Sequence, residues 1–177
     1  MKTIVVDVVQ KALDGGKARI DKKLGKLAEK KILKPEAASA AAESILWTMD
    51  YGQIAGADLV VEAATEDEGL KKKIFAQVEK LVAPTALLTS NSSHMEPEVI
   101  FAGIADKSRT CCTHYFFPAE RNYIVEVVPG TLLAVGDGFR IVRIRGDSAE
   151  NVEVDWDDPV TPEQEGLPEF EDCYDGP

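Results

Sequence analysis

The sequence predicts an α/β fold in which a doubly wound, mostly parallel sheet is followed by a β-hairpin and an acidic tail. Over residues 1–130, short β-branched or apolar runs alternate with segments of helical periodicity, the order typical of strands joined by crossover helices. Residues 139–156 instead alternate as two strands around a polar turn. The end of the chain is acidic and rich in proline, which is typical of disorder. We therefore expect a domain over 1–130, a hairpin segment over 131–158 and a disordered tail over 159–177.

The first elements are expected to be a strand, two helices and a second strand. The β-branched run TIVVDVV predicts a strand that ends near Asp7. Apolar residues at helical spacing then predict an amphipathic helix through Ile32, with lysines on its polar face. Pro35 suits the first turn of a short alanine-rich helix. The run ILWTMDY, residues 45–51, predicts the next strand.

The run DLVVEAA, residues 58–64, is almost continuously apolar and lies between helical segments in the sequence. This is the pattern of a parallel strand buried on both faces. The helix that follows, over 67–82, is expected to turn one stripe inward: Leu70, Ile74, Val78 and Leu81. The remaining expected elements are strands over 85–90, 109–116 and 123–128 and a short helix over 96–105.

Composition indicates a globular protein with a single core. The chain has 177 residues, of which 45% are hydrophobic and 29% are charged. No apolar run approaches the roughly 20 residues of a membrane span, and the N-terminus has no signal-peptide pattern. We therefore expect a cytoplasmic location and no membrane association.

Cysteine and histidine content argues against a metal centre. The three cysteines, Cys111, Cys112 and Cys173, have no CxxC spacing, so we expect free thiols in a reducing compartment. Only two histidines are present, and no Cys/His cluster is formed in the sequence. We therefore expect no metal.

The net charge of −11 disfavours nucleic acid as a partner, but the charge is unevenly distributed. Residues 1–34 hold ten Lys/Arg against four Asp/Glu, whereas residues 131–177 hold three against thirteen. The basic end could bind a phosphorylated small molecule. The alternative, a solvated helix face, is the more common explanation of such a run.

A charged residue interrupts the apolar strand that the sequence predicts at 123–128. Glu126 shares a strand face with Ile124 and Val128. A carboxylate in that setting must be hydrogen-bonded or paired, because burying it alone costs several kcal/mol or forces it to take up a proton. His114 is a candidate partner.

Three segments of the chain, in this order, carry a family resemblance: DLVVEAATEDEGLKKKIF, LLTSNSSHMEPE and THYFFPAERNYIVEVVPG. Together they resemble the cofactor-binding domain of the L-3-hydroxyacyl-CoA dehydrogenases of fatty-acid β-oxidation, over residues 1–130. The resemblance implies an oxidoreductase with a Rossmann-type domain that binds NAD. It also implies an acyl-CoA substrate, an L-3-hydroxyacyl-CoA whose C3 hydroxyl is oxidised to give the 3-ketoacyl-CoA.

The resemblance assigns roles to four residues as a catalytic set. His114 would be the general base that takes the proton from the C3 hydroxyl. Glu126 would hold the other ring nitrogen and stabilise the imidazolium. Ser93 matches the serine that hydrogen-bonds the substrate hydroxyl, and Asn91 lies in the same turn beside the reacting centre. Serine and asparagine are also preferred helix caps, and both readings of this turn can hold at once.

The resemblance also suggests residues for the cofactor and the substrate. Asp7 matches the acidic residue that accepts hydrogen bonds from the adenosine ribose, which implies NAD over NADP. Glu66 and Lys71 match positions near the nicotinamide ribose, although both could be ordinary polar residues of a helix start. Lys23 is a candidate for the CoA phosphates, with a solvated lysine as the alternative.

The match is incomplete at both ends, so we expect an incomplete Rossmann-type sheet. The first strand and the GxGxxG loop, whose glycines let the backbone approach the pyrophosphate, are missing. The segment ALDGGKAR is not expected to replace them. The missing strand would leave an edge for the later hairpin, a second copy of the chain or another strand-supplying partner.

The helical C-terminal domain of the family is not recognisable either. These gaps leave open an alternative function: a non-catalytic α/β module that binds CoA, a nucleotide or a protein partner. A related dehydrogenase of small hydroxy acids fits less well, because the spacing of His114 and Glu126 matches the acyl-CoA enzymes.

Overall fold

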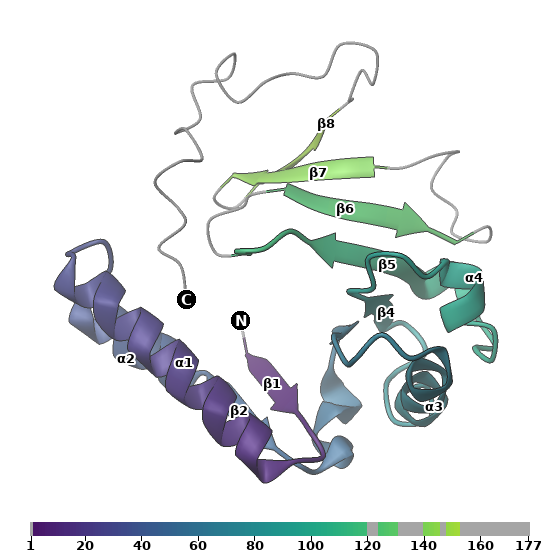
Figure 1. Cartoon of the computed structure of the whole chain (residues 1–177), viewed down its shortest axis with the longest axis horizontal. Helices are drawn as coiled ribbons and strands as arrows, with labels where there is room; N and C mark the ends of the chain where they lie inside the picture. The colour runs from purple at the N-terminus through teal and green to yellow at the C-terminus, as the bar shows by residue number, and fades with distance from the viewer. Residues whose placement is uncertain (1, 120–123, 131–139, 146–147, 153–177) are drawn as a thin grey trace. The chain divides into compact units, whose positions relative to one another are not determined.

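The computed structural model describes residues 2–119, 124–130, 140–145 and 148–152, with side chains described up to residue 130. The chain divides into two compact units. Figure 1 labels their helices and strands. The first unit is Met1–Val60 with Gly69–Leu87, and the second is Val61–Glu68 with Leu88–Pro177. No helix in the described ranges has both the length and the apolar character that a membrane crossing needs.

The first unit is built on a pair of parallel strands, in which Thr3 lies opposite Ile45 and Val6 lies opposite Thr48. The segment ALDGGKAR lies inside the first helix, so its glycines form no loop. A Cβ on Gly16 would lie 2.9 Å from the ring of Trp47, so the glycine permits a close approach of helix and strand. The elements are β1 (Thr3–Val6), α1 (Gln10–Glu29), α2 (Pro35–Glu43), β2 (Ile45–Thr48), η1 (Tyr51–Gly56) and α3 (Glu68–Val78).

The second sheet has the strand order β3-β4-β5-β6-β7-β8 among the described residues. β4 and β5 are parallel, and from β5 onward each strand is antiparallel to the next. β6 reverses direction because only eight residues, 116–123, connect it to β5, which is too few for a crossover helix. The elements are β3 (Leu59–Glu62), β4 (Leu87–Ser90), α4 (Pro97–Ile100), η2 (Lys107–Arg109), β5 (Thr110–Tyr115), β6 (Ile124–Pro129), β7 (Arg140–Arg145) and β8 (Ser148–Val152).

This mixed arrangement confirms the predicted α/β class. β7 and β8 pair antiparallel, as the alternation of residues 139–156 predicts. The tail predicted over 159–177 lies outside the described residues. The division into a domain over 1–130 and a separate hairpin segment stays a prediction.

Two predictions about burial were wrong, the second only in part. β3 is not buried on both faces: the exposed fractions of Leu59 and Val61 are 50% and 41%. Leu59 and Val61 are two positions apart and project to the same face of the strand, so one face is exposed while the other carries the buried Glu62. The stripe predicted for α3 is confirmed at Val78 and wrong at Leu70, which is exposed; Ile74 and Leu81 are half-buried, and the other buried side chains of the helix are Lys71 and Phe75.

Candidate active site

His114 and Glu126 lie directly opposite each other in the antiparallel pair of β5 and β6. Cross-strand partners of this kind project to the same face of a sheet. The Nδ1 atom of His114 is 3.3 Å from Oε2 of Glu126, and the two side chains are 24% and 28% exposed. The pair is therefore close enough for a hydrogen bond and still reached by solvent.

The ring of Phe116 flanks the imidazole on the same side of β5. The two ring centroids are 4.7 Å apart, and the rings are tilted by 56°. The contact limits rotation of the His114 ring from one side, while Glu126 holds it at Nδ1. The Nε2 atom is thus the ring nitrogen that does not face Glu126.

Asn91 connects the end of β4 to the end of β5. Its Oδ1 atom accepts a hydrogen bond of 2.9 Å from the backbone N–H of Tyr115, the residue after His114. This bond fixes the turn that follows β4 against the strand that carries the imidazole. The predicted residues Asn91, Ser93, His114 and Glu126 therefore belong to one unit.

The turn after β4 is also held by Glu66, which lies in the second unit as well. The hydroxyl of Ser92 donates to Glu66 Oε2 over 2.9 Å, and the backbone N–H of Ser93 faces Oε1 at 3.3 Å. Ser92 is buried and Ser93 is exposed. Its exposure leaves the Ser93 side chain accessible to a substrate.

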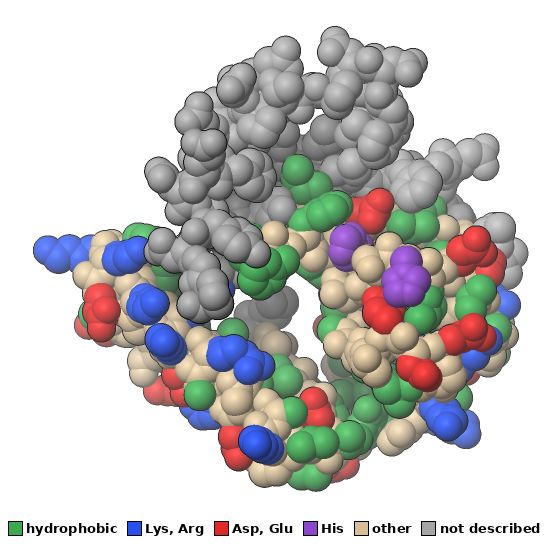
Figure 2. Space-filling view, viewed as in Figure 1, with side chains coloured by type: hydrophobic (Ala, Val, Ile, Leu, Met, Phe, Trp, Pro, Cys, Tyr) green, Lys and Arg blue, Asp and Glu red, His purple; other side chains and the backbone are tan. Residues whose placement is uncertain are grey.

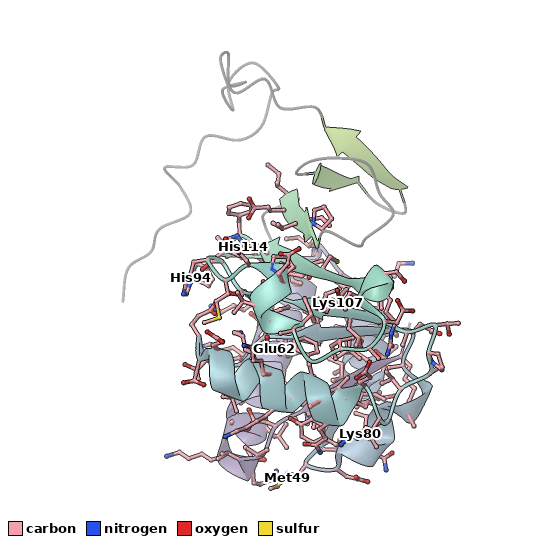
Figure 3. The ribbon with its side chains drawn as sticks, turned by 90° about the vertical axis from the view of Figure 1, so that its right-hand side faces the viewer. Met49, Glu62, Lys80, His94, Lys107 and His114 are labelled. Atoms are coloured by element: carbon pink, nitrogen blue, oxygen red, sulfur yellow. The ribbon has the colours of Figure 1, made fainter. Side chains whose placement is uncertain are left out.

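Two residues near this turn were missed by the sequence reasoning. Glu62 ends β3 with only 5% of its side chain exposed, and its Oε2 accepts a 2.6 Å hydrogen bond from the Ser90 hydroxyl. The signal for Glu62 was available, since it is a glutamate in an apolar run like Glu126. His94 was also not singled out. It lies near His114 on one face of the molecule (Figures 2 and 3).

Three predicted residues lie in the first unit. Asp7 follows β1, and its Oδ1 accepts a 2.9 Å hydrogen bond from the N–H of Val9 at the start of α1. Lys23 is exposed on α1. Figure 2 shows lysine and arginine side chains, in blue, along this helix. Lys71 is buried, with 1% exposure. The ligand roles predicted for these residues stay predictions.

The two cysteines in the described part of the chain both lie on β5. Cys111 and Cys112 on β5 are free cysteines, as predicted, and Cys173 lies outside the described residues. Burial raises the pKa of the Cys111 thiol, which lowers its thiolate fraction and reactivity. Within the described ranges no group of three or more His, Cys, Asp or Glu side chains could hold a metal ion.

Comparison with known proteins identifies the family. The sequence model of the NAD-binding domain of 3-hydroxyacyl-CoA dehydrogenase matches residues 1–133. The chain belongs to this family. The family resemblance drawn from the sequence is thereby confirmed, and NAD is the cofactor of the matched domain.

The names of similar proteins are consistent with this family. The chain is 34% identical over 133 residues to the 3-hydroxyadipyl-CoA dehydrogenase of Escherichia coli, covering 74% of the chain and 27% of the relative. It is 31% identical over 127 residues to the fatty acid oxidation complex subunit alpha of Pseudomonas paraeruginosa, covering 72% of the chain and 18% of the relative. The chain thus spans only about a quarter or less of the length of these two relatives.

Solved structures show the same fold. The 3-hydroxybutyryl-CoA dehydrogenase of Escherichia coli superposes with a TM-score of 0.72 at 32% identity, over 74% of this chain and 28% of that chain. The (S)-3-hydroxybutyryl-CoA dehydrogenase of Ralstonia eutropha also gives 0.72, at 27% identity, over 75% of this chain and 47% of that chain.

The residues of this chain fit NAD only in part. A carboxylate after a parallel strand, as Asp7 provides, suits the hydroxyls of a ribose. The 177 residues contain no GxGxxG sequence, however, and Gly15 and Gly16 are enclosed within α1. Among the described residues, Asp7 therefore stays a candidate for the ribose, and no glycine turn for the pyrophosphate is found there.

Proposed function

We propose that this chain carries the proton-accepting part of a dehydrogenase that oxidises the C3 hydroxyl of an L-3-hydroxyacyl-CoA to the 3-ketoacyl-CoA. Family membership supports the reaction class. The observation that carries the proposal is the 3.3 Å approach of His114 Nδ1 to Glu126 Oε2. A neutral imidazole that donates from Nδ1 presents the lone pair of Nε2, which is the state a general base requires.

In this proposal Nε2 of His114 accepts the proton of the C3 hydroxyl. The carboxylate of Glu126 fixes the tautomer beforehand and stabilises the imidazolium afterwards. Ser93 hydrogen-bonds the substrate oxygen, and Asn91 holds its own turn against β5 through the N–H of Tyr115. NAD, when bound, supplies the hydride acceptor.

The substrate class is an acyl-CoA thioester, while the acyl group stays unassigned. The relatives are named for 3-hydroxyadipyl-CoA and 3-hydroxybutyryl-CoA, which differ in chain length and in terminal charge. The exposed lysines of α1, Lys23 among them, are the candidates for the phosphates of CoA.

The test is reduction of acetoacetyl-CoA, followed as loss of NADH absorbance. His114→Ala is expected to lower kcat by at least about 100-fold, the usual contribution of a general base. His94→Ala removes the neighbouring exposed imidazole and serves as the matched control. Full turnover by His114→Ala would refute the assignment of the base.

A second candidate is a non-catalytic module that binds an acyl-CoA without turnover. Tested as an isolated polypeptide, these 177 residues offer no GxGxxG sequence to contact the pyrophosphate. Losing two or three charge-assisted hydrogen bonds to the pyrophosphate, at ~1.5–3 kcal/mol each, would weaken NADH binding by several orders of magnitude. Fluorescence titration separates the candidates: micromolar NADH binding with turnover supports the dehydrogenase, and acetoacetyl-CoA binding without either supports the module.

A further inference from the structure

The turn that carries Asn91 and Ser93 is connected to a buried carboxylate that takes no part in the proposed chemistry. Glu62, at the end of β3, has both carboxylate oxygens in short hydrogen bonds. Oε2 accepts from the Ser90 hydroxyl over 2.6 Å, and Oε1 accepts from the backbone N–H of Ala64 over 2.6 Å. Figure 3 labels Glu62 and His114, both of the second unit.

Backbone bonds extend the same connection. The carbonyl oxygen of Glu62 accepts from the N–H of Asn91 over 2.7 Å. The Ser90 hydroxyl oxygen, which donates to Glu62, also lies 3.3 Å from the N–H of Ser92 as an acceptor. Glu62 therefore bonds to Ala64 in the segment after β3 and to Asn91 in the turn after β4, and Ser90 bonds to Ser92 in the same turn.

A second glutamate completes the arrangement four residues later. Glu66, in the segment that Glu62 holds through Ala64, binds Ser92 and the N–H of Ser93. The turn after β4 is thus held from two sides: by Ser90 and Glu62 at its start, and by Glu66 at its middle.

We propose that Glu62 and Ser90 form a buried positioning pair that sets the location of Asn91 and Ser93 relative to His114. This inference rests on the proposed function, because it concerns the same site. Ser90 is 0% exposed and Glu62 is 5% exposed, so neither contacts a substrate and both act through their neighbours. Hydrogen bonds to a carboxylate are short and strong, which suits a group whose task is to hold two backbone segments in one geometry.

The decisive variant is Ser90→Ala, which removes the donor to Glu62 and the acceptor for Ser92 N–H in one step. We expect kcat for acetoacetyl-CoA reduction to fall about 10- to 100-fold with KM changed less than about twofold, because a misplaced group costs rate more than binding. Glu62→Gln should have a smaller effect, because its amide still accepts from Ala64 and can donate to Ser90. Ser39→Ala is the control, since Ser39 forms an exposed bond of the same type with Glu43, 3.0 Å long, in the first unit.

An NMR readout without ligand keeps this inference separate from the proposed function. Ser90→Ala is expected to shift the amide signals of Asn91, Ser92 and Ser93, and also that of Tyr115, which Asn91 binds. If the wild type shows no turnover but these signals move, the proposed function fails and the positioning pair stands. If the signals of Ser93 and Tyr115 match the wild type, or if kcat per folded molecule is unchanged, the pair has only a structural role and the inference is overturned.

Discussion

Gly16 on α1 is expected to be intolerant of a side chain because of its contact with Trp47. A Cβ at position 16 would lie 2.9 Å from one ring carbon of Trp47 and 3.4 Å from the next, closer than normal contact. Overpacking of this kind costs ~1–3 kcal/mol. Replacing a mid-helix glycine by alanine otherwise stabilises a helix by ~0.5–1 kcal/mol. Gly16→Ala therefore combines two opposing terms.

Gly25 on the same helix separates the two terms, because a Cβ there would meet nothing within 4 Å. Gly25→Ala is expected to stabilise the chain by the propensity term alone. The free energy of unfolding, measured by urea titration with circular dichroism, should therefore be ~1–3 kcal/mol lower for Gly16→Ala than for Gly25→Ala. In a Trp47→Leu background that difference should shrink. Equal stabilities of the two alanine variants in the wild-type background would refute the close contact.

Three further predictions concern single side chains. Cys111, whose pKa is raised by burial, should react with iodoacetamide at pH 8 more slowly than a free cysteine, as measured by mass spectrometry of the peptide; an equal rate would contradict the raised pKa. The hydrogen bonds from Gln53 and from the N–H of Gly52 hold the pKa of Asp50 below its ordinary value of 3.8. The stabilisation from Asp50 should thus be fully present above pH 3.8 and be lost as the pH falls through the lower pKa of the folded state. The NMR signal of the Gly52 amide, which donates to Asp50, should follow this titration, and its pH dependence should disappear in Asp50→Asn. Glu126→Gln should lower kcat less than His114→Ala does, because the amide oxygen still accepts from Nδ1 but no longer carries the charge that stabilises the imidazolium; equal losses would show that Glu126 has a further role.

Local patterns predicted the elements well because each is encoded over a few residues. The β-branched run at 3–6 and Pro35 at the start of α2 are sufficient on their own. The burial of β3 depends instead on which elements cover its two faces, which a local pattern does not record. The inner stripe of α3 was predicted correctly at Val78 but not at its start, where the packing buries Lys71 at 1% exposure and leaves Leu70 exposed.

The sequence predicted the charged pair of the candidate site, His114 and Glu126, but not the hydrogen bonds that hold the turn after β4. Glu126 was noticed because it interrupts an apolar strand, and His114 proved to lie opposite it. Glu62 interrupts an apolar strand in the same way, but DLVVEAA is almost continuously apolar, and its pattern predicts only a buried strand. Its partners, Ser90 and Ala64, are 28 and 2 residues away. A pairing across 28 residues follows from the β3–β4 register, which a single sequence does not specify.

The two strand glutamates differ in a way that suits different tasks. Glu62 is almost fully buried, and both of its carboxylate oxygens accept hydrogen bonds of 2.6 Å, which hold the neighbouring segments in one geometry. Glu126 is 28% exposed and 3.3 Å from a ring that is itself 24% exposed. In the proposed reaction Glu126 lies beside the ring that takes up the proton, at a place that a substrate can reach. We infer that the buried carboxylate of Glu62 positions the turn, whereas the partly exposed carboxylate of Glu126 assists the proton transfer.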